Sequence, residues 1–236
     1  MGRPEKPVDR TVPARAKLAD FLRDRKAAAN LTYREMSEIT DGAPSKATLE
    51  RAASGASVPL WETVRAFVLV TMVEEEEPES IFAAPPAMAR GKELWIRARR
   101  ATRAPYYIHK APDPALISSK ADLSRALRHQ HVWAGYPTPG EMERMSGPGE
   151  LPSSTTRRII EGTTLPVDPI QILAFLNACY VLTPAGLEPW LAATVRVFEK
   201  KNTTGYPGKW SSAHVDLLEQ IQRLELFEKI GDYAFA

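Results

Sequence analysis

Apolar residues recur at intervals of three and four positions along most of the chain, the spacing that places side chains on one face of an α-helix. Leu18, Phe21 and Leu22 predict a first helix that begins at Ala14. A strongly apolar helix is expected from about Pro59. The chain contains 20 prolines, most of them between such runs, so the pattern predicts an all-α protein with defined breaks between helices.

Two short helices are predicted between these runs. Thr32 followed by Glu35 has the composition of a capping box, in which each side chain accepts a backbone N–H of the other residue. The helix that follows is expected to turn Met36 and Ile39 inward. A turn over Asp41-Gly42-Ala43-Pro44 ends it, since this sequence cannot remain helical.

Ser45 then begins a third helix, which is expected to turn Leu49 and Ala52 inward and to stop near Gly55. The same punctuation returns in the second half of the chain. The segments TLERAASGASVP, from Thr48, and TTRRIIEGTTLP, from Thr155, align without a gap. The sequence therefore predicts an internal duplication.

The second copy has its own start and stop signals. Thr138 with Glu141 forms another capping box, and Met142 and Met145 match Met36 and Ile39 of the first copy. Ser153 begins the third helix of this copy and Gly162 ends it. Asp168-Pro169 starts a fourth helix. Thr156 occupies a place where the pattern calls for an apolar residue.

The likeness extends to a fifth helix in each copy. Glu93-Leu94-Trp95-Ile96 resembles Glu188-Pro189-Trp190-Leu191, and each tryptophan is expected to pack back on its own unit. In the first copy an acidic and proline-rich insertion, over residues 73–91, is expected to form an exposed loop.

Beyond the duplication, a loop and a C-terminal amphipathic helix fill residues 201–236. The helix is expected from about Ser212, because five apolar residues follow at helical spacing: Val215, Leu218, Ile221, Leu224 and Phe227. Such a stripe has two interpretations, packing within the chain or a homodimer contact over residues 212–230.

The distribution of charge along the chain is typical of a protein with a polyanionic partner. The formal net charge is only +2, but residues 1–30 carry eight Lys and Arg against four Asp and Glu, and Arg90 to Lys110 carries seven against one. The second segment also holds aromatic residues and could contact phosphates through Arg97, Arg99, Arg100, Arg103, Tyr106, Tyr107 and His109. A solvated helix face is the alternative for both segments.

Other classes of protein receive little support. The four histidines, His109, His129, His131 and His214, lie outside any nucleophile motif or metal-ligand spacing, so no catalytic residue, metal or cofactor is expected. Cys179, the single cysteine, lies in an apolar run and is expected to be buried. No apolar run approaches the ~20 residues of a membrane span, and we expect a cytoplasmic protein.

The segment Lys46-Ala47-Thr48-Leu49-Glu50-Arg51-Ala52-Ala53-Ser54-Gly55, followed by Val58-Pro59-Leu60-Trp61-Glu62, resembles the XRE/Cro-type helix-turn-helix family and its actinobacterial variants. The resemblance implies two tandem five-helix domains, over residues 14–110 and 111–200. Residues 1–13 are basic, contain proline and lack apolar periodicity, so they are expected to form a flexible basic arm.

The resemblance also implies that the third helix of each copy is a recognition helix in the major groove of double-stranded DNA. In this reading Arg51 is bidentate to guanine, Ala47 packs on a thymine methyl, and Glu50 orients Arg51 or faces solvent. The N-termini of the second helices hold a phosphate. The implied contacts are Thr32, Tyr33, Arg34, Ser45, Lys46, Ala47, Thr48 and Arg51 in the first copy, and Thr138, Ser153, Ser154, Thr155, Arg157 and Arg158 in the second.

These contacts imply a sequence-specific transcriptional regulator associated with the nucleoid, which reads two unlike half-sites. Two alternatives stay open. The chain could be an interaction protein with a degenerate helix-turn-helix, or a DNA-binding protein of plasmid or phage maintenance.

Overall fold

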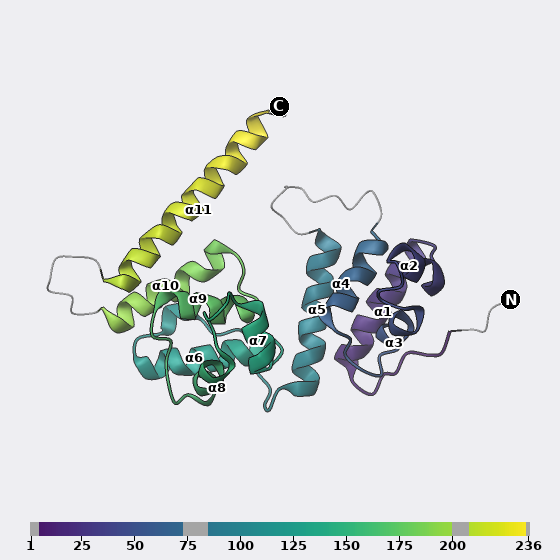
Figure 1. Cartoon of the computed structure of the whole chain (residues 1–236), viewed down its shortest axis with the longest axis horizontal. Coiled ribbons are helices and arrows are strands. Elements are labelled where there is room, and N and C mark those ends of the chain that lie inside the picture. Colours follow the sequence, from purple (N-terminus) through teal and green to yellow (C-terminus); the bar gives the residue numbers. More distant parts are fainter. Residues whose placement is uncertain (1–4, 73–84, 200–207, 235–236) are drawn as a thin grey trace. The chain divides into compact units, whose positions relative to one another are not determined.

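The computed structural model describes residues 5–72, 85–199 and 208–234, and these residues form helices and connecting loops without a strand (Figure 1). The all-α prediction is therefore confirmed for the described part of the chain. The chain divides into two compact units, Met1–Pro105 and Tyr106–Ala236. The boundary lies five residues before the expected one.

Unit 1 contains five helices: α1 (Pro13–Ala28), α2 (Tyr33–Ile39), α3 (Lys46–Ala52), α4 (Trp61–Val70) and α5 (Pro86–Arg103). Helices α1, α4 and α5 pack on one another, and the short pair α2 and α3 packs against α4 (Figure 1). Each helix contributes fully buried apolar side chains to one core, which includes Leu18, Leu22, Met36, Leu49, Val64, Phe67, Val68, Leu94 and Trp95.

Unit 2 begins with a 3₁₀ turn, η2 (Pro114–Leu116), and repeats the order of unit 1. Its helices are α6 (Lys120–Trp133), α7 (Pro139–Met145), α8 (Ser153–Glu161), α9 (Pro169–Ala178), α10 (Pro184–Phe198) and α11 (Lys209–Ala234). Phe175 of α9 takes the central place that Phe67 of α4 has in unit 1, and neither is exposed to solvent. Trp95 and Trp190 are buried in their own units, as expected.

The predicted helix caps are confirmed in both units. Thr32 N donates to the Glu35 carboxylate at 2.7 Å while Glu35 N donates to Thr32 Oγ1 at 3.2 Å. Thr138 and Glu141 repeat both distances. These reciprocal bonds satisfy two of the N–H groups that the first turn of a helix leaves without partners.

A buried polar contact is also repeated, with different chemistry. The C-terminal carbonyls of α4 and α9 lie in the core and need donors from elsewhere in the unit. In unit 1, Arg25 Nη2 donates to Thr71 O at 2.5 Å. In unit 2, Gln130 Nε2 donates to Cys179 O at 3.3 Å. Both donors come from the first helix of their unit, so the two units satisfy the end of the fourth helix in the same way.

The N-terminal segment differs from its prediction. Residues 1–13 were expected to form a flexible arm, but residues 5–12 follow the surface of unit 1 as a strap. Asp9 N donates to Ser54 O at 2.8 Å, and the Arg10 guanidinium makes two bonds to the Asp20 carboxylate, at 2.9 and 3.0 Å. A backbone hydrogen bond and a bidentate ion pair hold this segment in place.

The loop predicted over residues 73–91 ends earlier than expected. Residues 73–84 lie outside the described part, but α5 begins at Pro86, because proline is favoured in the first turn of a helix. Gly91 then packs closely. A Cβ at this position would lie 3.3 Å from both the Phe21 ring and Val68.

The second helices bury fewer residues than expected. Met36 and Met142 are buried, but Ile39 is 59% exposed and Met145 is 44% exposed. Both helices have seven residues and meet the core through their first turn, so the residue at the last position leaves the core. The prediction that Ile39 and Met145 point inward is wrong.

The C-terminal helix packs within unit 2, mainly against α10. It begins at Lys209 instead of Ser212 and buries Trp210 and Leu217, whereas Val215 and Leu218 of the expected stripe are exposed. His214 Nε2 lies 2.7 Å from Glu188 Oε1 of α10. Side chains beyond Arg223, including Leu224 and Phe227, lie outside the described residues. No helix in the described ranges has the length and apolarity to cross a bilayer.

Substitution of two glycines, Gly55 and Gly42, tests whether the strap packs against unit 1. Gly55 and Gly42 have similar left-handed backbone angles, φ +76° and +79°, but a Cβ at Gly55 would lie 2.6 Å from Asp9 O, whereas the space beside Gly42 is open. We expect Gly42→Ala to lower the free energy of unfolding by about 1 kcal/mol, the cost of the backbone angle alone. Gly55→Ala should lower it by about 3 kcal/mol because the clash adds to that cost.

Denaturant unfolding of the full chain, with hydrogen exchange of α1 amides to isolate unit 1, measures both losses. Equal losses for the two variants would show that the strap does not pack against Gly55.

Candidate functional site

The solvent-facing surface of α3 is the first candidate site. Only Leu49 and Ala52 of this helix are buried, so its remaining side chains are free to carry function. Ser45, Lys46, Ala47 and Arg51 are exposed, and Thr48 is half-buried. The structure thus brings these five sequence-predicted residues together on one short helix and its cap.

Hydrogen bonds organise this surface. Ser45 caps α3, and its Oγ lies 3.0 Å from Thr48 Oγ1. Arg51 Nη2 donates to the same Thr48 oxygen at 3.3 Å. Of the two expectations for Glu50, the second is confirmed: it faces solvent, and its carboxylate pairs with Lys46 Nζ at 3.7 Å. Thr48 is the residue that holds the guanidinium.

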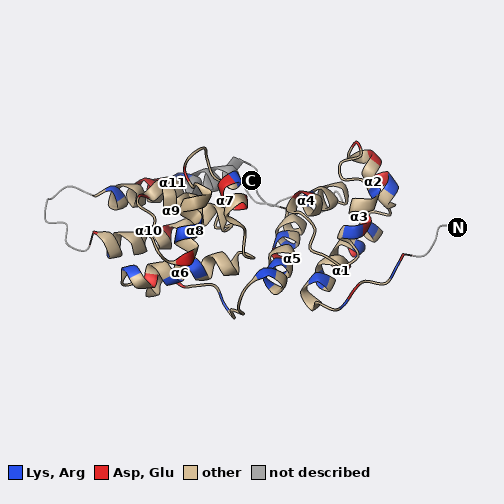
Figure 2. Ribbon diagram, turned by 60° about the horizontal axis from the view of Figure 1, so that its bottom comes forward, with Lys and Arg blue, Asp and Glu red and all other residues tan. Residues whose placement is uncertain are grey.

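The corresponding surface on α8 is more basic. Ser154, Arg157 and Arg158 are exposed, while Ser153 and Thr155 are half-buried. Within the described residues, the two guanidinium groups make no ion pair with an acidic side chain. Figure 2 shows the basic positions on α3 and α8 together with the acidic ones that flank them.

Thr156 fills the place of α8 where an apolar residue was expected. It is fully buried, and its hydroxyl donates to Pro152 O at 3.1 Å, one turn earlier in the chain. This internal bond removes the cost of burying the hydroxyl, so the helix packs against its unit despite the polar residue.

The predicted contact residues at the start of α2 and α7 have different surroundings from those on α3 and α8. Thr32 and Thr138 are exposed, but their oxygens are occupied by the capping boxes. Bonds from the Thr32 backbone and hydroxyl lower the pKa of Glu35. Arg34 is exposed and lies 3.5 Å from Glu38. Tyr33 is 8% exposed, so its ring belongs to the interior of unit 1, and its hydroxyl donates to Glu5.

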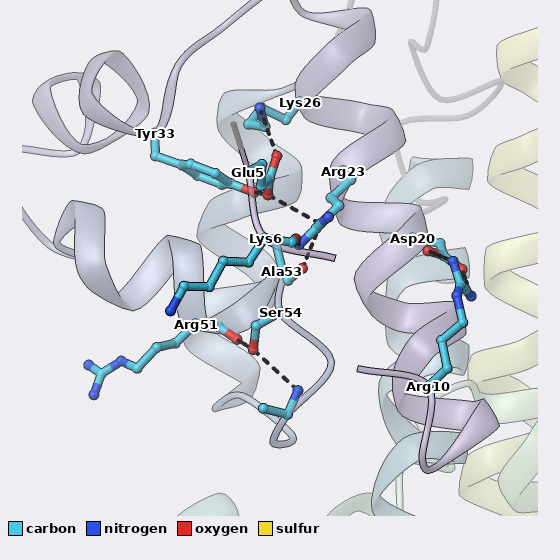
Figure 3. Close-up of polar contacts among 11 residues, drawn as sticks. Glu5, Lys6, Arg10, Asp20, Arg23, Lys26, Tyr33, Arg51, Ala53 and Ser54 are labelled. Carbon is cyan, nitrogen blue, oxygen red and sulfur yellow. Dashed lines mark hydrogen bonds and ion pairs between the residues drawn. The ribbon is translucent and has the colours of Figure 1, made fainter. Parts of the chain in front are cut away.

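Sequence reasoning missed the side chains that surround Tyr33. The strap places Glu5 against the Tyr33 hydroxyl, with Arg23 and Lys26 of α1 on the same carboxylate (Figure 3). The one signal for this cluster in the sequence is an acidic residue inside a basic N-terminal segment.

The basic stretch of α5 is only partly a surface. Arg99 is buried, with its guanidinium carbon 4.6 Å from the centre of the Trp95 ring. Lys92 Nζ lies 4.0 Å from the Trp61 ring centre and 4.7 Å from that of Trp95. Arg97 pairs with Glu93. The interpretation of this stretch as a phosphate-contacting segment is corrected for Arg99, which packs inside unit 1.

The described ranges offer little support for a metal site or a reactive thiol. They contain no group of three or more His, Cys, Asp or Glu that could hold a metal ion. Cys179 is buried, as expected, and burial raises the pKa of its thiol, which disfavours the reactive thiolate.

The buried Lys92 of α5 makes the stability of the protein depend on pH in a testable way. Burial, aided by the positive charge of Arg99 and opposed by Glu62, lowers the pKa of Lys92 to about 7 from 10.5. Since the folded pKa lies below the unfolded one, the unfolded chain binds more protons between pH 7 and 10.5. This group therefore makes the protein more stable as the pH rises through that window, and it adds no slope below pH 7.

Lys92→Met should lose this part of the pH dependence, because methionine fills similar space without a titrating group. Denaturation midpoints of the two chains, measured from pH 6 to 10, test this expectation. Parallel curves over the whole range would show that Lys92 keeps its ordinary pKa.

Searches of protein-family models, of curated proteins and of solved structures with this chain each found no match. The functional assignment therefore rests on the geometry of the described residues.

Proposed function

We propose that this chain is a sequence-specific double-stranded DNA-binding protein, in which α2–α3 and α7–α8 are two helix-turn-helix units. The observation that carries this proposal is the pair α3 and α8. Each is a short helix that fully buries only two side chains and leaves several polar ones exposed to solvent. A helix held in this way suits the major groove, which admits one α-helix and offers a distinct donor and acceptor pattern for each base pair.

The contacts on α3 support a role for Arg51 in base recognition. Its guanidinium is oriented by Thr48, which is itself bonded to the cap residue Ser45. An arginine that is already oriented loses less side-chain entropy when it binds the two acceptors of a guanine. In this proposal Lys46 contacts a guanine or a phosphate, and Ala47 packs on a thymine methyl.

On α8 the proposal assigns Arg157 and Arg158 to phosphates or guanine and Ser154 to either kind of acceptor. In the gap-free alignment Arg158 matches Arg51, but Ser154 and Arg157 take the places of Ala47 and Glu50. One chain therefore reads two unlike half-sites, as a transcriptional regulator or as a protein of plasmid or phage maintenance. In a bacterial cell such a protein would be found on the nucleoid.

A second candidate function rests on the exposed apolar residues. Ile39 and Met145 occupy the last position of α2 and α7, and both are exposed, as are Leu60 and Val167 just before α4 and α9. Apolar side chains at matched places on two units suit contacts with another protein. In this alternative, replacing Ile39 and Met145 by serine abolishes capture of a partner and leaves duplex affinity unchanged.

The proposal predicts the effect of two substitutions. Arg51→Ala and Arg158→Ala should each weaken binding to a selected duplex by about 5- to 100-fold and relax the preference at one base pair, since each removes a contact to a base edge. Arg90→Ala and Arg125→Ala are matched controls, because each removes a surface arginine that pairs with an acid on its own helix.

Fluorescence anisotropy with labelled duplexes at several salt concentrations measures the losses. The controls should stay within about twofold of the parent chain. Arg51→Ala and Arg158→Ala variants that bind like the controls, with unchanged base preference, would refute the assignment of α3 and α8 as recognition helices.

A further inference from the structure

Three donors converge on one carboxylate at the edge of unit 1. The Tyr33 hydroxyl donates to Glu5 Oε1, Arg23 Nε lies 3.1 Å from the same oxygen, and Lys26 Nζ lies 3.6 Å from Oε2 (Figure 3). Two cations and a hydroxyl form a cluster, the Arg23–Lys26–Tyr33 pocket, that holds an anion supplied by the chain itself. The bond from the Tyr33 hydroxyl to the carboxylate is charge-assisted, the stronger class of hydrogen bond, while Arg23 and Lys26 contact the carboxylate as ion pairs.

Contacts other than Glu5 hold the donors of this pocket. Arg23 Nε donates its one N–H to Ala53 O at 2.8 Å, and Arg23 Nη2 donates to Lys6 O at 2.8 Å. The Tyr33 ring packs edge-on against Phe67 with 6.2 Å between ring centres, and Lys26 Nζ lies 4.6 Å from the Tyr33 ring centre. Burial, with Glu5 next, raises the pKa of Tyr33, so its hydroxyl keeps its proton and remains a donor. These contacts of Arg23 and of the Tyr33 ring do not involve Glu5.

Glu5 can be exchanged more easily than the residues that hold it. Its side chain is 35% exposed, against 22% for Arg23 and 20% for Lys26. The strap is anchored further along the chain by Asp9 on Ser54 and by Arg10 on Asp20. Departure of Glu5 would release only the end of the strap, and it would leave two half-buried cations without their counterion. Such a site favours another anion.

The pocket also adjoins α3. Ala53, whose carbonyl oxygen Arg23 contacts, is the C-cap residue of α3, two positions after Arg51. Glu50 of the same helix lies close enough to raise the pKa of Tyr33 further. An anion bound by Arg23 would therefore lie beside the last turn of the helix that the proposed function places in the major groove.

We infer that the Arg23–Lys26–Tyr33 pocket is a binding site for a phosphate group of the DNA backbone, and that Glu5 occupies it in the DNA-free chain as an internal competitor. This inference rests on the proposed function. A phosphodiester carries one negative charge shared by two oxygens, as the carboxylate does, so it can take the same donors and cations. Exchange therefore keeps the charge balance of the pocket, while the competition with Glu5 lowers affinity for DNA.

A DNA-free experiment tests the pocket itself. Inorganic phosphate is titrated into the full chain and into Glu5→Gln at constant ionic strength, and the backbone amide signals of Lys26 and Tyr33 are followed by NMR. Glu5→Gln should show a saturable shift at least ten times tighter than that of the parent chain, and Lys26→Met in the same variant should abolish it. Glu93→Gln, which removes a surface carboxylate that pairs with Arg90 and Arg97, is the matched control and should behave like the parent.

Equal phosphate titrations for the parent chain and Glu5→Gln would overturn the pocket assignment. Unchanged amide spectra away from the strap show that Glu5→Gln remains folded.

A second experiment identifies the source of the phosphate. Glu5→Gln should bind duplex DNA at least threefold more tightly than the parent chain, whereas Glu93→Gln should not. Lys26→Met should weaken binding and reduce the slope of log affinity against log salt by about 0.9, because one phosphate contact is lost.

The outcomes separate this inference from the proposed function. Salt-sensitive duplex binding that is equal in the parent chain, Glu5→Gln and Glu93→Gln keeps the proposed function and refutes the internal competitor. Phosphate binding by Glu5→Gln without duplex binding by any chain refutes the proposed function and assigns the pocket to free phosphate.

Discussion

In both units, helices that are too short to be stable alone pack against a core built by longer helices. Helices of seven residues, such as α2, α3 and α7, lie well below the length at which an isolated helix persists in water. Each is held by a capped first turn and by one or two buried side chains, such as Met36 or Leu49. The fourth helix supplies the surface they pack on, and a polar side chain from the first helix satisfies the buried end of that fourth helix.

The small number of buried side chains on the short helices has a functional consequence. Because so few side chains of α3 and α8 take part in the core, their remaining positions can differ without loss of fold. The two units use that freedom: α3 carries a lysine paired with a glutamate, whereas α8 carries two adjacent arginines. The same scaffold thus presents two different polar surfaces, and the difference between them is the physical basis for proposing unlike half-sites.

The sequence predicted the features that depend on local chemistry. The capping boxes at Thr32 and Thr138 and the left-handed end of α8 at Gly162 follow from residues a few positions apart, and the structure has all three. The strap was missed because its partners, Asp20 and Ser54, are distant in the sequence.

The errors also have physical causes. Helical spacing marks which residues could share a face, but it does not tell where a seven-residue helix leaves the core, so Ile39 was placed on the wrong side. A count of charges likewise cannot separate Arg97 on the surface from Arg99 beneath Trp95, since only packing distinguishes them.

The central claim is that one chain reads two unlike half-sites with α3 and α8. Selection of bound sites from random double-stranded DNA by the full-length protein tests it most directly. Enrichment of two different short motifs at a fixed spacing is expected, with the preference at one position relaxed in one motif by Arg51→Ala and in the other by Arg158→Ala. Enrichment of a single palindrome, or of no motif at all, would contradict this claim.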